Sequence, residues 1–90
     1  MSGLMLEIVT PLGVQIAEEG LDRIILRRRE PVHDEGSLIS VYPSHGPLLV
    51  QTSAFVLRWD RAGEEGAVPV GPGVAEIYRD HVTLLATRAG

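Results

Sequence analysis

Two prolines and a histidine share one short stretch of this chain, Tyr42-Pro43-Ser44-His45-Gly46-Pro47-Leu48-Leu49. A proline has no backbone N–H to donate, so residues 43–47 cannot form the interior of a helix or of a central strand. The serine and the glycine beside the histidine are typical of a tight turn. The stretch therefore predicts a rigid loop that presents His45 at a surface and leads directly into an apolar strand.

Composition limits what such a chain can do. Its 90 residues are 44% apolar, which supports one small folded core rather than disorder. Cysteine and lysine are both absent, which excludes disulfides, thiolate metal sites and nucleophiles of either type. The net charge of −4 disfavours nucleic acid as a partner. No apolar run reaches the roughly 20 residues that cross a bilayer, and no basic leader opens the chain, so we expect a soluble protein.

Short segments with alternating apolar residues follow one another, separated by turn residues. The segments predicted as strands are 6–10, 14–17, 23–27, 48–51, 55–60, 68–70, 74–78 and 82–86. Residues 60–66 are polar and contain glycine, which predicts a hairpin loop, and residues 79–81 predict another turn. Residues 28–37 form the longest predicted loop. This spacing predicts an all-β chain, a flattened sandwich or barrel of short, mostly antiparallel strands, with residues 1–90 as a single domain.

Few residues suggest chemistry. The consecutive His-Asp-Glu at 33–35 is the one cluster of potential metal ligands, but neighbours on a loop rarely converge on one ion, so we expect a solvated acidic loop without a metal. Ser44 beside His45 lacks the strand–nucleophile–helix elbow of a hydrolase. Residues 71–73, Gly-Pro-Gly, lack the lysine and the helix of a phosphate loop. No catalytic residue and no cofactor are predicted.

The arginines at 27–29 and His45 each allow two interpretations. The three arginines at 27–29 could bind phosphate or an acidic partner, but a guard that protects a strand edge from pairing is the interpretation we favour. His45 could bond turn carbonyls, yet partner contact is favoured because a rigid loop loses little entropy on docking. His81 is predicted to be a surface residue.

Four motifs together resemble the amino-terminal β-sandwich domain of the epsilon subunit of F-type ATP synthases. Leu6-Glu7-Ile8-Val9-Thr10-Pro11-Leu12-Gly13 is similar to the family's opening strand and turn, and the stretch from Tyr42 to Leu49 is similar to its Pro-Gly-His-Ala-Pro-Leu-Leu loop and strand. Gly73-Val74-Ala75-Glu76-Ile77 resembles its Gly-x-x-Glu-Val segment, and Val82-Thr83-Leu84-Leu85-Ala86 its closing strand. Each motif is weak alone, but the four occur in the family's order over nearly the whole chain.

The resemblance implies a flattened sandwich of about ten strands and a central-stalk subunit without catalysis or a cofactor of its own. Members of the family bind the gamma shaft subunit and rest on the ring of membrane-embedded c subunits. The resemblance therefore implies coupling of the shaft to the proton- or sodium-driven rotor. It also implies a peripheral position at the cytoplasmic face of the bacterial inner membrane, without nucleic-acid binding and without direct membrane insertion.

The resemblance also implies which residues contact partners. The family's ring-facing loop corresponds to Ser37 and Leu38, and its shaft-facing surface corresponds to His45 and Val50. Tyr42, which opens the matching loop, is expected to contact a partner as well. Coupling of this kind requires contacts that resist torque, with the affinity concentrated in a few anchors.

The chain departs from the family's pattern in four ways. Ser40 and Ser44 stand where the family usually has glycine, and Pro72 replaces the first glycine of a pair. The loop at 27–36 is longer than in common members, as in epsilon-like subunits of the alternative, often sodium-translocating, ATPases. The sequence ends at Gly90, where family members continue into two α-helices that inhibit ATP hydrolysis. We therefore expect no C-terminal helical hairpin and no inhibition by helix insertion.

The residues alone leave a second hypothesis open, namely a stand-alone β-sandwich module that binds another protein or a small ligand. This alternative predicts a ligand-sized apolar pocket lined by His45 or Trp59. A small enzyme is disfavoured, because no acid, base and nucleophile are placed to act together.

Overall fold

The computed structural model describes residues 3–29 and 37–90, and every regular element within them is a β-strand. The strands are β1 (Leu4–Thr10), β2 (Gly13–Leu21), β3 (Arg23–Arg28), β4 (Ser37–Val41), β5 (Leu48–Thr52), β6 (Phe55–Arg61), β7 (Glu64–Val70), β8 (Gly73–Tyr78) and β9 (His81–Ala86). The all-β prediction is confirmed. The described residues form nine strands, against the expected number of about ten.

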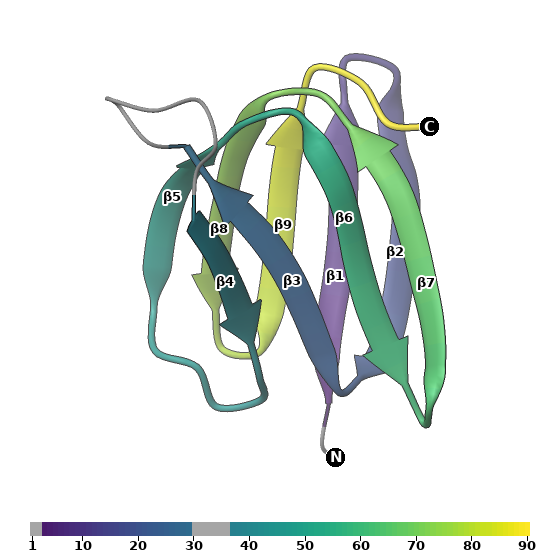
Figure 1. The fold of residues 1–90 in the computed structure, drawn as a ribbon, viewed down its shortest axis with the longest axis vertical. Coiled ribbons are helices and arrows are strands. Elements are labelled where there is room, and N and C mark those ends of the chain that lie inside the picture. The colour runs from purple at the N-terminus through teal and green to yellow at the C-terminus, as the bar shows by residue number, and fades with distance from the viewer. Residues whose placement is uncertain (1–2, 30–36) are drawn as a thin grey trace.

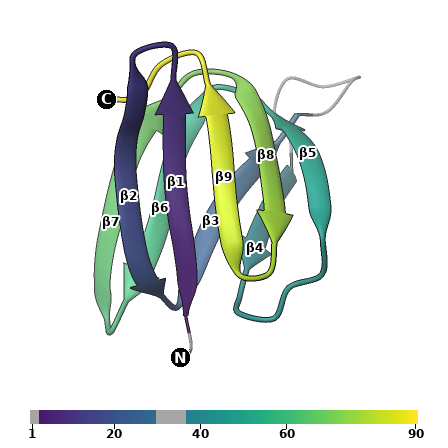
Figure 2. The same cartoon turned by 180° about the vertical axis from the view of Figure 1, so that it is seen from behind.

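The strands form one curled sheet in the order β2-β1-β9-β8-β5-β3-β6-β7, and β4 also pairs with β3. The sheet folds over on itself into two layers (Figure 1). The first layer holds β2, β1, β9, β8 and β5, and the second layer holds β4, β3, β6 and β7, as the reverse view shows (Figure 2). β1 pairs with β9 in parallel, and the other strand pairings are antiparallel.

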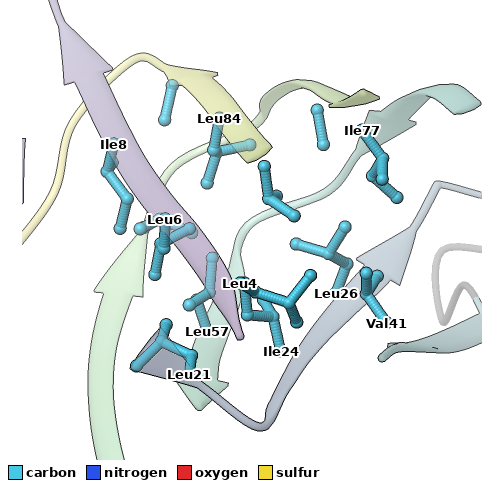
Figure 3. Close-up of a cluster of buried hydrophobic side chains, with 14 of the residues drawn as sticks. Leu4, Leu6, Ile8, Leu21, Ile24, Leu26, Val41, Leu57, Ile77 and Leu84 are labelled. Atoms are coloured by element: carbon cyan, nitrogen blue, oxygen red, sulfur yellow. The ribbon is translucent and has the colours of Figure 1, made fainter. Parts of the chain in front are cut away.

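The core lies between the two layers. Successive side chains of a strand point to opposite faces, and β1 buries every second residue, including Leu4, Leu6 and Ile8. Ile24 and Leu57 of the second layer lie in the same buried cluster (Figure 3). Each fully buried side chain of this size stabilises the fold by about 1.5–3 kcal/mol. The alternating pattern of the sequence is therefore the pattern that fills the space between the layers.

The hairpin predicted at residues 60–66 is confirmed, but its loop is shorter than predicted. β6 continues to Arg61, β7 begins at Glu64, and only Ala62 and Gly63 form the turn between them. Both turn residues have positive φ, 51° and 86°, which is typical of the two-residue turn that suits the twist of a hairpin. The second hairpin, β8–β9, is confirmed. It turns at Arg79 and Asp80, which also have positive φ.

The edge-guard interpretation of the arginines at 27–29 is wrong. β3 pairs with β4 along one side and with β6 and β5 along the other, so it is an interior strand. Among the three arginines, Arg28 has pairing partners on both sides, Ser37 in β4 and Thr52 in β5. β4 was not among the strands predicted from the sequence, because its short apolar run follows a charged segment directly.

β2 and β7 are the two ends of the sheet and do not pair with each other, so the sheet is not a closed barrel. Polar contacts nevertheless join β2 and the turn after it to the β6–β7 hairpin. Arg61 donates from Nη1 to the Glu19 carbonyl at 2.8 Å and lies 3.1 Å from Glu18 Oε1 through Nη2. The backbone N–H of Ala62 donates to Asp22 Oδ2 at 2.8 Å. These contacts fix how the two layers lie over each other at this end.

Candidate protein-docking surface

An apolar row crosses the outward side of the first layer. Residues directly opposite each other on paired strands point to the same face of a sheet. The register places Val14 of β2 opposite Val9 of β1, Val9 beside Leu85 of β9, and Leu85 opposite Val74 of β8. We call these four residues the apolar row. It runs across four strands that are adjacent in the first layer (Figure 2).

Much of the apolar row is open to solvent. Val14 is 57% exposed and Leu85 is 55% exposed, and Leu12 in the β1–β2 turn beyond the row is 89% exposed. A shallow depression of about 360 Å³ lies beside the row, lined by residues that include Val9, Leu85 and Pro72. Contiguous exposed apolar surface of this kind marks sites of protein association. This is the candidate site of the molecule.

Acidic side chains lie one row further along the same face. Glu7 of β1 is beside Thr83 of β9, which is opposite Glu76 of β8. Glu7 Oε1 lies 2.8 Å from His81 Nε2. His81, which was predicted to be a surface residue, is half-exposed and contacts this carboxylate. The apolar row is therefore bordered on one side by negative charge.

The loop that carries His45 lies at the end of the first layer away from the apolar row. Its turn closes with a 3.2 Å bond from the His45 backbone N–H to the Tyr42 carbonyl. Ser44 has a φ of 69°, in the region that favours glycine, which accounts for the glycine found here in the family it resembles. The Ser44 N–H donates to Asp80 Oδ1 at 2.6 Å, and this contact fixes the loop against the β8–β9 turn.

His45 itself is half-buried. Its Nδ1 lies 2.7 Å from the Gly46 carbonyl oxygen. This contact is the one expected from the first interpretation of His45, in which the ring bonds a carbonyl of its own turn. Partner contact by His45 stays a prediction.

Val50, which was predicted to contact the shaft, faces the core, and partner contact by Val50 stays a prediction. It belongs to the core and is only 9% exposed, whereas its neighbour Leu49 is 70% exposed. Leu49 is opposite Glu76, and Gln51 is opposite Val74, so both lie on the outward side of the first layer. The exposed apolar residue on the outward side of this strand is therefore Leu49.

The other predicted contact residues lie on the second layer. Ser37 opens β4, and Leu38 is exposed beside Arg27 on the outward side of that layer. Tyr42 follows β4 and is also exposed. Arg23 Nε donates a 2.8 Å hydrogen bond to the Asp60 carboxylate. Hydrogen bonds to this carboxylate and to Tyr42 raise the pKa of Arg23 above its usual value. Tyr42 thus takes part in a polar cluster of the second layer.

Some expectations concern residues outside those described. The His-Asp-Glu cluster at 33–35 and most of the loop at 27–36 lie there. Among residues 3–29 and 37–90, no group of three His, Asp or Glu side chains could hold a metal ion. The same two ranges contain no helix that is long and apolar enough to span a membrane.

Comparison with known proteins gives the following similarities. No protein-family model matches the chain. The ATP synthase epsilon chain of Alkalihalophilus pseudofirmus is 30% identical over 89 residues, which are 99% of this chain and 62% of that protein. The ATP synthase epsilon chain of Bacillus licheniformis is 28% identical over 89 residues, 99% of this chain and 63% of that protein. The chain thus spans less than two thirds of the length of these curated relatives.

Solved structures share the fold. A chain in the central stalk and c-ring of the Tetrahymena thermophila mitochondrial ATP synthase matches with a TM-score of 0.76 at 12% identity, over 97% of this chain and 65% of that chain. A chain in the OSCP/F1/c-ring structure of the Euglena gracilis mitochondrial ATP synthase matches with a TM-score of 0.82 at 16% identity, over 100% of this chain and 54% of that chain. Together with the sequence similarity, these matches confirm the resemblance to the ATP synthase epsilon subunit.

Proposed function

We propose that this chain is a non-catalytic central-stalk subunit of a rotary F-type ATP synthase. In this role it joins the gamma shaft subunit to the ring of c subunits, as one epsilon-type β-sandwich domain. The similarity to ATP synthase epsilon chains over 99% of the chain supports the assignment. We further propose that the protein lies at the cytoplasmic face of the bacterial inner membrane, as a peripheral subunit that neither enters the bilayer nor binds nucleic acid.

The apolar row is the observation that carries this proposal. Its residues come from four strands of one sheet, so their relative positions are fixed by backbone hydrogen bonds rather than by a loop. A rigid apolar surface loses little entropy when a partner covers it. We assign this face to the gamma subunit, with His45 at the far end of the same layer as a further contact.

Ser37 and Leu38 are the proposed contacts to the c-ring. They lie on β4 in the second layer, where Ser37 is opposite Arg28 of β3, so one rigid sheet would hold the two partners on neighbouring surfaces. Tyr42 is a proposed contact on the second layer. Torque would then pass through the paired strands, whose hydrogen bonds must all shear together before the sheet yields. No catalytic step by this chain is needed for that role.

The stand-alone ligand-binding module finds less support. Trp59 lines a depression of about 180 Å³ whose other walls include Glu18, Arg61, Glu64 and Glu65. Small-molecule sites are mostly apolar, with volumes of about 300–1,000 Å³. A depression this small and this charged does not suit the apolar ligand that the alternative requires.

Binding to the gamma subunit encoded by the same organism tests the proposal. Leu85→Asp places a charge in the middle of the apolar row and should weaken binding about thirtyfold, since a central contact carries about 2 kcal/mol. Val56→Asp is the matched control, because Val56 is similarly exposed but lies on β6 in the second layer. Circular dichroism should show that both variants keep the fold. An unmodified chain that fails to bind gamma would overturn the proposed function.

A further inference from the structure

Arg28 and Arg29 need another explanation once the edge-guard role is excluded. Arg28 has strand partners on both sides, and the Arg29 backbone N–H donates to the Gln51 carbonyl at 2.8 Å. Their backbone is therefore already paired, and their charge is not required to prevent pairing with another sheet. Two adjacent positive charges repel each other, in a protein whose net charge is −4. Such an arrangement favours a ligand of opposite charge.

The two arginines line a pocket. It has a volume of about 600 Å³ and is lined by Arg28, Arg29, Leu49, Val50 and Gln51. We call this the arginine pocket. Both arginines are exposed, and within the described residues no ion pair joins either of them to a carboxylate. Arg23 and Arg61, by contrast, each lie against an acidic side chain of the chain itself.

The arginine pocket continues the apolar row. Gln51 is opposite Val74, which is the last member of the row, so the pocket begins where the row ends. Leu49, 70% exposed, adds an apolar wall at this end. Arg29 lies on the side of Gln51, whereas Arg28 is opposite Thr52 on the core side of β3. A partner that covers the apolar row and extends past Val74 would therefore reach Arg29 first and Arg28 only around the end of β3, where both arginines line the pocket.

We propose that the arginine pocket binds aspartate or glutamate side chains of the partner that covers the apolar row, and this inference rests on the proposed function. A guanidinium matches a carboxylate with two parallel hydrogen bonds, and such pairs fix the register of an interface. A free phosphate would pair with the arginines but leave Leu49 exposed, whereas a protein segment covers both. The acidic partner segment thereby sets the direction in which the shaft lies on the apolar row.

The test measures binding of the full chain to the gamma subunit as the NaCl concentration rises from about 50 to about 500 mM. The double variant Arg28→Gln/Arg29→Gln should bind about tenfold more weakly at low salt and lose most of the salt dependence. Arg28→Lys/Arg29→Lys should fall between, because lysine keeps the charge but not the paired hydrogen bonds. Arg58→Gln, on the outward side of the second layer, is the control and should bind within about twofold of the unmodified chain.

The outcomes separate this inference from the proposed function. If Leu85→Asp abolishes binding while Arg28→Gln/Arg29→Gln binds with unchanged affinity and salt dependence, the arginine pocket has no such role and the central-stalk function stands. If the unmodified chain does not bind gamma, both are overturned. Titration with inorganic phosphate and with ATP, followed by NMR of the arginine side chains, should show no saturation below about 1 mM. Saturable binding that is lost in the double variant would assign the pocket to a free anion instead.

Discussion

The indole ring of Trp59 lies against Gly66 on the neighbouring strand, so closely that a Cβ atom at position 66 would come within 2.1 Å of Cε2 of the ring. The two residues are opposite each other in the β6–β7 pairing. Only glycine leaves room for the ring there. This contact holds the single tryptophan of the chain over the end of β7.

We expect Gly66→Ala to displace the indole and to lower the free energy of unfolding by about 1–3 kcal/mol, because overpacking forces side chains or backbone to shift. Tryptophan fluorescence should move to longer wavelength as the ring gains exposure to water, and urea unfolding should report the loss of stability. Gly46→Ala is the control, since a Cβ there meets no atom within 4 Å. Equal stability of the two variants would contradict the packing described for Trp59.

Two buried threonines should respond in opposite ways to the same substitution. Thr52 is 1% exposed and, among the described residues, its Oγ1 has no hydrogen-bond partner. Thr52→Val should therefore raise the free energy of unfolding by about 1 kcal/mol, because it removes a hydroxyl that is buried without a partner. Thr10 is also buried, but its Oγ1 accepts a 3.1 Å bond from the Leu12 N–H.

Thr10→Val should consequently lower the free energy of unfolding by about 1 kcal/mol. Thermal and urea unfolding of the two variants, compared with the unmodified chain, measure both changes. A loss of stability in Thr52→Val as large as that in Thr10→Val would show that the Thr52 hydroxyl is satisfied.

The neighbours Leu49 and Val50 offer a test of which side of β5 faces the core. Val50→Gln should lower the free energy of unfolding by about 2–3 kcal/mol, because it places an amide in the buried cluster. Leu49→Gln should change it by less than about 0.5 kcal/mol, since the side chain is already in water. Chemical denaturation of both variants is the measurement. A reversed order would mean that β5 presents its other side.

Asp80 should control the mobility of the His45 loop. Asp80→Ala removes the acceptor of the Ser44 N–H and should lower stability by about 1 kcal/mol. Hydrogen exchange of the Ser44 amide should become about tenfold faster as the loop opens locally. Asp80→Asn keeps an oxygen acceptor and tolerates the positive φ of 64°, so it should retain most of the protection. Unchanged exchange in Asp80→Ala would show that the loop is held by other contacts.

Alternation of apolar residues predicted most strands, because half-buried strands require that alternation. It worked best for β1 and for the β8–β9 hairpin, whose inward residues are almost all buried. At residues 60–66 it found the hairpin but overestimated the length of the loop, because β6 and β7 run into solvent there and need no apolar residues to stay paired. Polarity there reports exposure on both sides rather than a loop.

The candidate site could be predicted only in part. The sequence indicates the rigid loop of His45, because the prolines constrain it locally. The apolar row combines Val9 and Val14 with Val74 and Leu85, and no pattern within one segment brings these together before the pairing of β1 with β9 is known. The side of β5 that faces outward could not be predicted from the sequence either, because a shift of one residue along a strand reverses every side chain. The arginines at 27–29 were misinterpreted because a strand's neighbours are a property of the whole sheet.

The parallel pairing of β1 with β9 has a consequence for how the protein is made. Met5 lies beside His81 and Val9 beside Leu85, so β1 leaves the ribosome well before the strand with which it pairs in parallel. Long-range pairing of this type folds slowly, because closing so large a loop comes before any gain from contact. Until β9 emerges, the β1–β2 hairpin has one flank unpaired and its apolar side uncovered. The exposed apolar side and the unpaired flank favour aggregation of the nascent chain during that interval.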